Sequence, residues 1–166
     1  AIVWQDRRTA DVTEAMKARG LEPEVQKATG LVLDPYFSAS KIAWLLDRVE
    51  GARERAARGE LACGTIDSWV IWKLTAGRSH VTDVTNASRT SLFGLESLQW
   101  EDRLCDAFGV PSGLLPEVLP CAGEFGQSDP KHLGRALPIT GVAGDQQAAL
   151  VGHAALGAGR SEEHTS

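Results

Sequence analysis

The segment from Leu137 to Leu150 constrains the fold more than any other part of the sequence. An apolar run from Leu137 to Ala143 predicts a strand, Gly144 and Asp145 predict a turn, and the residues from Gln146 onward predict a helix. A buried strand that turns into a helix is the unit from which α/β proteins are built. Because helical patterns alternate with short β-prone pieces elsewhere in the chain, we predict an α/β architecture.

Apolar residues at helical spacing, bounded by capping residues and glycines, predict the other helices. The expected N-caps are Thr9, Ser38 or Ser40, and Thr65. The helix after Thr65 has apolar residues around most of its circumference, so we expect it to be largely buried. The predicted helices cover residues 10–19, 23–29, a stretch after Ser38 that runs to about 49, 52–58, 66–74 and 100–108.

Composition and charge exclude several classes of protein. The 166 residues are 43% hydrophobic and 23% charged, which is ordinary for one globular domain with a core. A net charge of −5 without a cluster of basic residues argues against a nucleic-acid partner. No apolar run is long enough to span a membrane. Cys63, Cys105 and Cys121 form no CxxC pair, which favours reduced, buried thiols in a cytosolic protein.

Both ends of the sequence are unusual. The apolar run from Ala1 to Trp4 is typical of a buried strand, and no initiator Met or targeting peptide precedes it. We therefore expect the start to be internal to a longer protein. Residues 160–166 share none of the preceding pattern and resemble a translated sequencing-adapter oligonucleotide, so we expect a non-native tail. A mobile polar tail is the alternative.

Asp145 is the strongest candidate for chemistry in the sequence. The motifs GxxxxGK(S/T), GxGxxG, GxSxG and HExxH are absent, and the histidines lack the spacing of metal ligands. Asp145 is expected at the carboxyl end of a strand, where α/β sheets place ligand sites. It could simply cap the following helix, or it could bind a polyhydroxylated molecule together with Gln146 and Gln147.

Two further segments have unusual patterns. Pro35 disfavours helix at Asp34, so Tyr36 is expected on a connection. The run from Thr82 to Thr90 is too polar for a core and too ordered in residue type for a linker. Neither pattern alone indicates a function.

Several segments, taken together and in order, resemble the FGGY carbohydrate kinase family. Lys41 and Trp44 stand at positions of the family signature. The segments from Asp34 to Phe37 and from Gly144 to Gln147 are similar to the members that phosphorylate glycerol, rather than a pentulose or gluconate. The matching segments are residues 1–9, 29–38, 49–53, 64–67, 81–90 and 144–150.

The resemblance implies a ribonuclease-H-like, actin-type ATPase fold, with residues 1–159 as part of the N-terminal domain of a two-domain kinase. It implies transfer of the γ-phosphoryl group of ATP to glycerol, with Mg²⁺, in a cytoplasmic enzyme that is a homo-oligomer at full length. Most of the nucleotide site is expected outside this chain, so we expect the chain alone to be inactive. The alternatives are another sugar or polyol kinase of the family, or a non-catalytic polyol-binding domain.

The same resemblance assigns roles to individual residues. Asp145 matches the catalytic carboxylate, which also binds glycerol. Gln146 and Tyr36 match positions that hydrogen-bond glycerol, and Trp4 matches an aromatic residue that packs on its carbon backbone. These residue types suit a triol, which offers three hydroxyl groups and one small apolar face. We expect Asp145 to affect rate more than affinity, since a carboxylate with a pKa of about 4 orients the hydroxyl and accepts its proton late.

Overall fold

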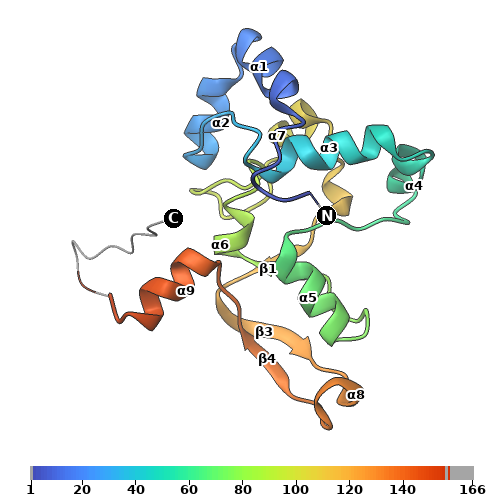
Figure 1. The fold of residues 1–166 in the computed structure, drawn as a ribbon, viewed down its shortest axis with the longest axis vertical. Coiled ribbons are helices and arrows are strands. Elements are labelled where there is room, and N and C mark those ends of the chain that lie inside the picture. Colours follow the sequence, from blue (N-terminus) through green and yellow to red (C-terminus); the bar gives the residue numbers. More distant parts are fainter. Residues whose placement is uncertain (1, 156, 158–166) are drawn as a thin grey trace.

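The computed structural model describes residues 2–155 and 157 (Figure 1). A group of helices forms one end of the molecule, and two small sheets with further helices form the other. The tail expected at residues 160–166 lies outside the described residues. None of the helices in the described part is long and apolar enough to cross a membrane.

The elements follow the predicted alternation of helices and short strands. The helices are α1 (Ala10–Ala18), α2 (Glu22–Thr29), α3 (Ser38–Arg48), α4 (Ala52–Ala57), α5 (Ile66–Leu74), α6 (Val84–Ala87), α7 (Asp102–Phe108), the 3-10 helix η1 (Ser112–Leu114), α8 (Pro130–Leu133) and α9 (Asp145–Gly152). The strands are β1 (Val81–Asp83), β2 (Glu117–Leu119), β3 (Ala122–Gln127) and β4 (Pro138–Gly141).

The predicted helices are confirmed in place, and Thr9 and Thr65 stand at the N-caps of α1 and α5 as predicted, but neither side chain makes a capping hydrogen bond. Glycines with positive φ end α2 and α7, at Gly30 (φ 69°) and Gly109 (φ 68°), as glycine stops require. Thr9 precedes α1, yet its hydroxyl makes no capping bond and instead lies 2.8 Å from the hydroxyl of Ser40. Phe37, rather than either serine, stands at the N-cap of α3. The hydroxyl of Thr9 therefore bonds across to α3 rather than to its own helix.

The two sheets are small and of different type. Strands β1 and β2 pair in parallel, with Val81 opposite Glu117, whereas β3 and β4 form an antiparallel hairpin with an irregular register. The strand predicted over Leu137 to Ala143 is therefore shorter than expected and mostly exposed. Among the described residues it has a partner on one side only, β3, which leaves its other edge uncovered.

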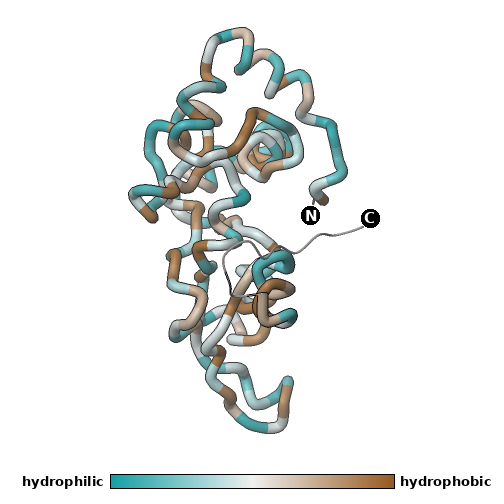
Figure 2. The backbone as a smooth tube through the Cα atoms, turned by 90° about the vertical axis from the view of Figure 1, so that its left-hand side faces the viewer, coloured by the Kyte–Doolittle hydropathy of each residue, from teal (hydrophilic) through white to brown (hydrophobic). Residues whose placement is uncertain are grey.

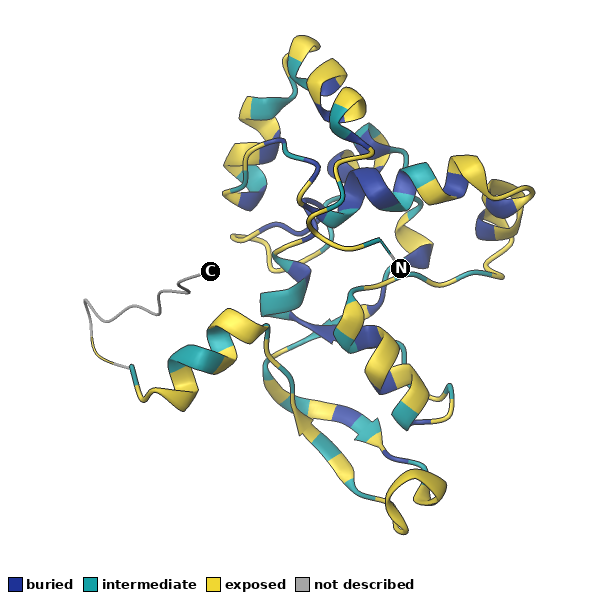
Figure 3. Ribbon diagram, viewed as in Figure 1, coloured by how far each residue is buried: buried dark blue, intermediate teal, exposed yellow. Residues whose placement is uncertain are grey.

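Burial is concentrated at the helical end of the molecule. Figure 3 shows buried positions on the inner faces of α1, α2, α3 and α7, and Figure 2 shows apolar positions on the inside of the same region. A smaller core lies between α5 and the sheets, where Ile71, Val81 and Phe125 pack together. Cys105 is buried, Cys63 and Cys121 are half-buried, and all three are free thiols.

Two predictions about burial are wrong. Helix α5 buries only Ser68 and Ile71, while Ile66 is 69% and Trp69 is 59% exposed, because α5 packs on β1 and β3 with a single face. The predicted N-terminal strand is also not formed over Ile2 to Trp4. No strand in the described part lies beside this segment, and a strand needs a paired neighbour to satisfy its backbone.

Candidate functional site

The aromatic half of the candidate site is formed where the N-terminal segment meets the loop before α3. The rings of Trp4 and Tyr36 lie with their centroids 5.3 Å apart, tilted by 47°, and Phe37 packs edge-on against Tyr36 at 5.1 Å. Trp4 and Tyr36 are exposed while Phe37 is buried. The rings of Trp4 and Tyr36 are exposed to solvent, and the buried ring of Phe37 supports Tyr36, so the exposed rings can contact the carbon atoms of a small ligand.

Lys41 joins the two segments that carry these rings. Its Nζ donates hydrogen bonds to the carbonyl oxygens of Val3 (2.8 Å), Trp4 (3.2 Å) and Tyr36 (3.2 Å). The side chain is only 5% exposed. Burial lowers the pKa of Lys41, although the nearby carboxylates favour its charged form. All three ammonium protons therefore have an acceptor in the backbone of the aromatic half.

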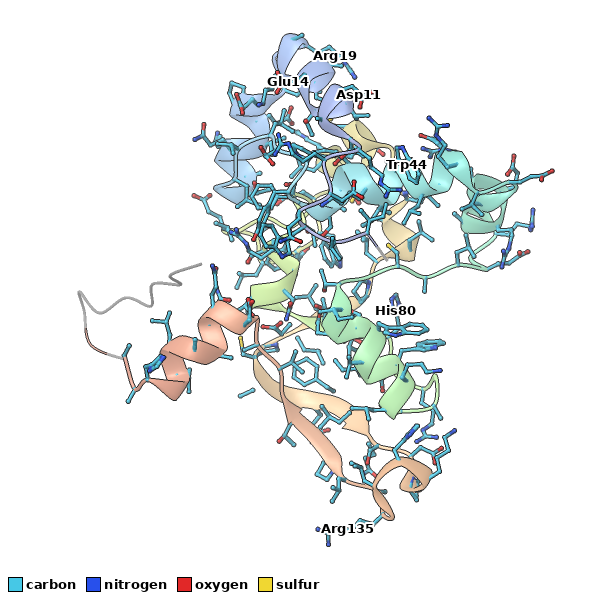
Figure 4. All side chains as sticks on the ribbon, viewed as in Figure 1. Asp11, Glu14, Arg19, Trp44, His80 and Arg135 are labelled. Carbon is cyan, nitrogen blue, oxygen red and sulfur yellow. The ribbon has the colours of Figure 1, made fainter. Side chains whose placement is uncertain are left out.

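The loop after Trp4 is fixed to α3 by a second signature residue. The guanidinium of Arg8 lies 4.7 Å from the ring centroid of Trp44, which Figure 4 shows on α3. Arg8 also forms paired hydrogen bonds with Asp6, which lower the pKa of Asp6 to about 2. These contacts hold the chain after Trp4, and the hydrogen bond from Lys41 to Val3 holds it before Trp4.

The polar half of the candidate site is the start of α9. Asp145 is the first residue of the helix, and its Oδ1 accepts a hydrogen bond of 2.9 Å from the backbone N–H of Gln146. Gly144, not Asp145, stands at the N-cap, and no side chain caps the helix. The carboxylate of Asp145 thus bonds a first-turn N–H of α9, as the cap interpretation expected, although it stands one residue after the N-cap position. Both Asp145 and Gln146 are exposed and can contact a ligand.

The loop before Asp145 is held at two points. The backbone N–H of Val142 donates to the carbonyl oxygen of Cys121 at 2.9 Å. The backbone N–H of Gly144 donates to Oγ1 of Thr85 at 2.7 Å. Asp145 thus follows a backbone whose position depends on two distant parts of the chain.

Asp83, which accepts hydrogen bonds from Thr85, is a fully buried carboxylate. Its Oδ2 accepts hydrogen bonds from the N–H (2.9 Å) and hydroxyl (2.5 Å) of Thr85 and from Sγ of Cys121 (3.1 Å). Its Oδ1 accepts from the N–H and Nδ2 of Asn86. Burial alone would raise the pKa of Asp83, but these hydrogen bonds hold it below its ordinary value.

Trp4, Tyr36, Asp145 and Gln146 are the site residues predicted from the sequence, and the structure brings them together in two pairs. Trp4 contacts Tyr36, and Asp145 contacts Gln146, but no hydrogen bond or aromatic contact among the described residues joins one pair to the other. No role was predicted for Asp83. Its sequence context does predict one, because an Asp followed by Thr and Asn two and three residues later is typical of a carboxylate that caps its own turn.

The described residues do not by themselves form a complete metal site. No three His, Cys, Asp or Glu side chains among them gather closely enough to hold a metal ion. Mg²⁺ prefers oxygen ligands from carboxylates and phosphates, and Asp145 alone would supply one of them. We therefore assign no metal ligand among the described residues.

Comparison with solved structures defines the class of protein. The structure is similar to Plasmodium falciparum glycerol kinase with ADP, with a TM-score of 0.88 and 38% identity, covering 93% of this chain and 31% of that one. A xylulose kinase from Lactobacillus acidophilus has the same fold, with a TM-score of 0.76 at 23% identity over 91% of this chain and 31% of its own. The fold is that of the N-terminal domain of an actin-like sugar kinase.

Sequence comparison gives the family. Residues 1–152 match the model of the N-terminal domain of the FGGY family of carbohydrate kinases, and the chain belongs to that family. It is 60% identical to a glycerol kinase of Thermus brockianus over 98% of this chain and 33% of the relative. It is also 60% identical to glycerol kinase 1 of Pseudomonas aeruginosa, over 93% and 31%. The chain spans about a third of the length of the curated relatives it matches.

Proposed function

We propose that this chain supplies much of the glycerol site of an enzyme that transfers the γ-phosphoryl group of ATP to glycerol, giving sn-glycerol 3-phosphate. The observation that carries the proposal is 60% identity to glycerol kinases over nearly the whole chain. The exposed Trp4–Tyr36 pair and the exposed Asp145–Gln146 pair support it, because they provide an apolar face and the polar groups that a triol requires.

Each residue has a distinct role in this proposal. Trp4 packs on the carbon backbone of glycerol, and the Tyr36 hydroxyl and the Gln146 amide hydrogen-bond its hydroxyl groups. Asp145 orients the hydroxyl that attacks and accepts its proton late in the transfer. Phosphoryl transfer has a loose transition state, so positioning of the nucleophile contributes more than generation of free alkoxide.

ATP and Mg²⁺ complete the proposed reaction. A related glycerol kinase has been solved with ADP, which supports a nucleotide as the second substrate. The resemblance to the family places most of the nucleotide site outside this chain, so we propose that both are held mainly by other parts of the enzyme. We propose a cytoplasmic enzyme, which the three free thiols support, and a homo-oligomer at full length. That residues 1–159 are native and 160–166 are foreign stays a prediction, which the genomic reading frame tests.

The proposal is tested by Asp145→Asn in the full-length enzyme. This substitution keeps the shape of the side chain and removes the proton acceptor, so kcat should fall about 10²-fold or more while KM for glycerol changes much less. Asp11→Asn is the matched control, since Asp11 is an exposed carboxylate on α1, labelled in Figure 4. Retention of more than about a tenth of the wild-type kcat would refute the role of Asp145 as the base.

Substrate comparison tests the identity of the polyol. Wild-type enzyme should phosphorylate glycerol with a higher kcat/KM than a pentulose or gluconate. A faster reaction with a pentulose would favour another sugar kinase of the family. Binding of glycerol without phosphorylation in the presence of ATP would favour a non-catalytic polyol-binding domain.

A further inference from the structure

The polar segment from Asp83 to Thr90 contacts both halves of the candidate site. At its start, the hydroxyl of Thr85 accepts a hydrogen bond from the N–H of Gly144, the residue before Asp145. At its end, the carbonyl oxygen of Thr90 accepts from the N–H of Ala39, in the first turn of α3, at 2.9 Å. Figure 1 shows α6, the helical part of this segment, between the start of α9 and the region of α3.

A cation–π contact strengthens the attachment of this segment to the start of α3. The guanidinium carbon of Arg89 lies 5.1 Å from the ring centroid of Phe37, which in turn packs against Tyr36. The segment itself is internally fixed, because Ala87 is fully buried and the hydroxyl of Thr90 donates to the carbonyl oxygen of Ala87 at 2.7 Å. A short, rigid piece of chain therefore lies between the loop of Asp145 and the loop of Tyr36.

The hydroxyl of Thr85 can hold Gly144 only because Asp83 orients it. A hydroxyl has one proton, and that of Thr85 is donated to the carboxylate of Asp83. Its lone pairs are then left to face the N–H of Gly144. Asp83 is in turn fixed by Asn86 and by Cys121, whose carbonyl oxygen accepts from Val142. The carboxylate of Asp83 thus bonds both Thr85, which holds the N–H of Gly144, and Cys121, which holds the N–H of Val142.

We propose that the segment from Asp83 to Thr90 is a brace that sets the separation between the aromatic and polar halves of the glycerol site, with Thr85 as the positioning residue for Asp145. This proposal rests on the proposed function for its kinetic consequence, but not for its structural one. Thr85 touches neither glycerol nor nucleotide in it. It acts through the backbone of Gly144 on the direction in which Asp145 presents its carboxylate.

The kinetic test compares Thr85→Val and Thr85→Ser in the full-length enzyme. Valine keeps the shape of threonine and removes the acceptor for Gly144, whereas serine keeps the acceptor. Thr85→Val should lower kcat about 10- to 100-fold, the effect of a small misplacement of a catalytic group, with little change in KM for glycerol. Thr85→Ser should restore kcat to within about threefold of wild type.

Thr82→Val is the matched control. Thr82 is buried on β1, one residue before Asp83, and its hydroxyl also donates to a carboxylate, that of Asp67, at 2.6 Å. That bond leads to α5 rather than to either half of the site. Thr82→Val should therefore lose comparable stability and keep kcat within about threefold of wild type. If Thr85→Val does not fold, Thr85→Ala takes its place in the same comparison.

Amide hydrogen exchange supplies a test that does not require activity. The peptide spanning residues 141–147 should exchange faster in Thr85→Val than in wild type, Thr85→Ser or Thr82→Val. Equal exchange in all four proteins, or a kcat for Thr85→Val equal to that of Thr82→Val, would overturn the brace. If wild-type enzyme does not phosphorylate glycerol, the proposed function fails and the exchange measurement still decides the brace.

Discussion

Replacement of Lys41 by methionine tests whether the ammonium group organises the aromatic half of the site. Methionine retains most of the apolar stem and removes the three hydrogen bonds to the carbonyl oxygens of Val3, Trp4 and Tyr36. A hydrogen bond to a charged group contributes about 1.5–3 kcal/mol. Because these carbonyls belong to exposed residues that water can reach after the change, we expect a total loss of about 2–4 kcal/mol rather than the full sum.

The same change should weaken glycerol binding. If about 1.4 kcal/mol of the lost free energy is the cost of reordering Trp4 and Tyr36 when glycerol binds, the Kd for glycerol rises about tenfold. Titration calorimetry of the full-length enzyme measures this Kd, and urea unfolding measures the loss of stability. The kcat should change little, since Lys41 lies with the aromatic half and far along the chain from Asp145.

Lys17→Met provides the control for loss of a lysine. Among the described residues, Lys17 forms a salt bridge with Glu14, at 3.0 Å on α1, and solvent-accessible pairs of this kind contribute about 0.2–1 kcal/mol. A Lys41→Met enzyme with the stability and glycerol affinity of the Lys17→Met enzyme would refute the role of Lys41.

Two other predictions concern stability and are measured by urea unfolding. Asp83→Asn should cost about 2–3 kcal/mol at pH 7, because an amide cannot accept all the bonds that the buried carboxylate accepts. The pKa of Asp83 is lowered in the folded state, so its contribution is present above pH 3.8 and is lost below it; a difference from wild type that does not shrink below about pH 4 contradicts this. Gly30→Ala should cost more than Gly20→Ala: both need positive φ, at about 1 kcal/mol each, but only at Gly30 would a Cβ meet another side chain, 3.2 Å from Cδ1 of Leu95. Equal losses would show that Leu95 moves aside.

The helices could be predicted from sequence because their signals are local. Apolar spacing and glycine stops located α1, α2 and α7 to within about two residues. Burial could not be predicted in the same way. The apolar residues around α5 indicate a buried helix, yet burial depends on what lies against each face, and the described chain covers only the face that carries Ile71.

The residues of the candidate site also divide into those that local sequence signals predict and those that they do not. Tyr36 on a connection and Asp145 at the start of a helix follow from their immediate neighbours, Pro35 and Gly144. The contact of Trp4 with Tyr36 joins residues 32 positions apart, which no local pattern encodes, and its cause lies in the buried ammonium of Lys41 between them. The lysine stands in an otherwise apolar or small stretch of α3, and the resemblance to the family, rather than its spacing, marked it together with Trp4 and Tyr36.

The polar run from Thr82 to Thr90 shows how a local pattern can serve a distant site. A carboxylate as buried as that of Asp83 is tolerated only when its oxygens are satisfied, and Thr85 and Asn86 satisfy them within the same turn. The turn is therefore self-contained, which explains why its residues are polar although the segment lies inside the molecule. Because its own hydrogen bonds do not depend on the ligand, it can fix Gly144 at a sequence distance of 59 residues before any substrate binds. In the proposed site, the rigid element lies outside the residues assigned to glycerol, which leaves Asp145 and Tyr36 exposed to a ligand while their loops are held in place.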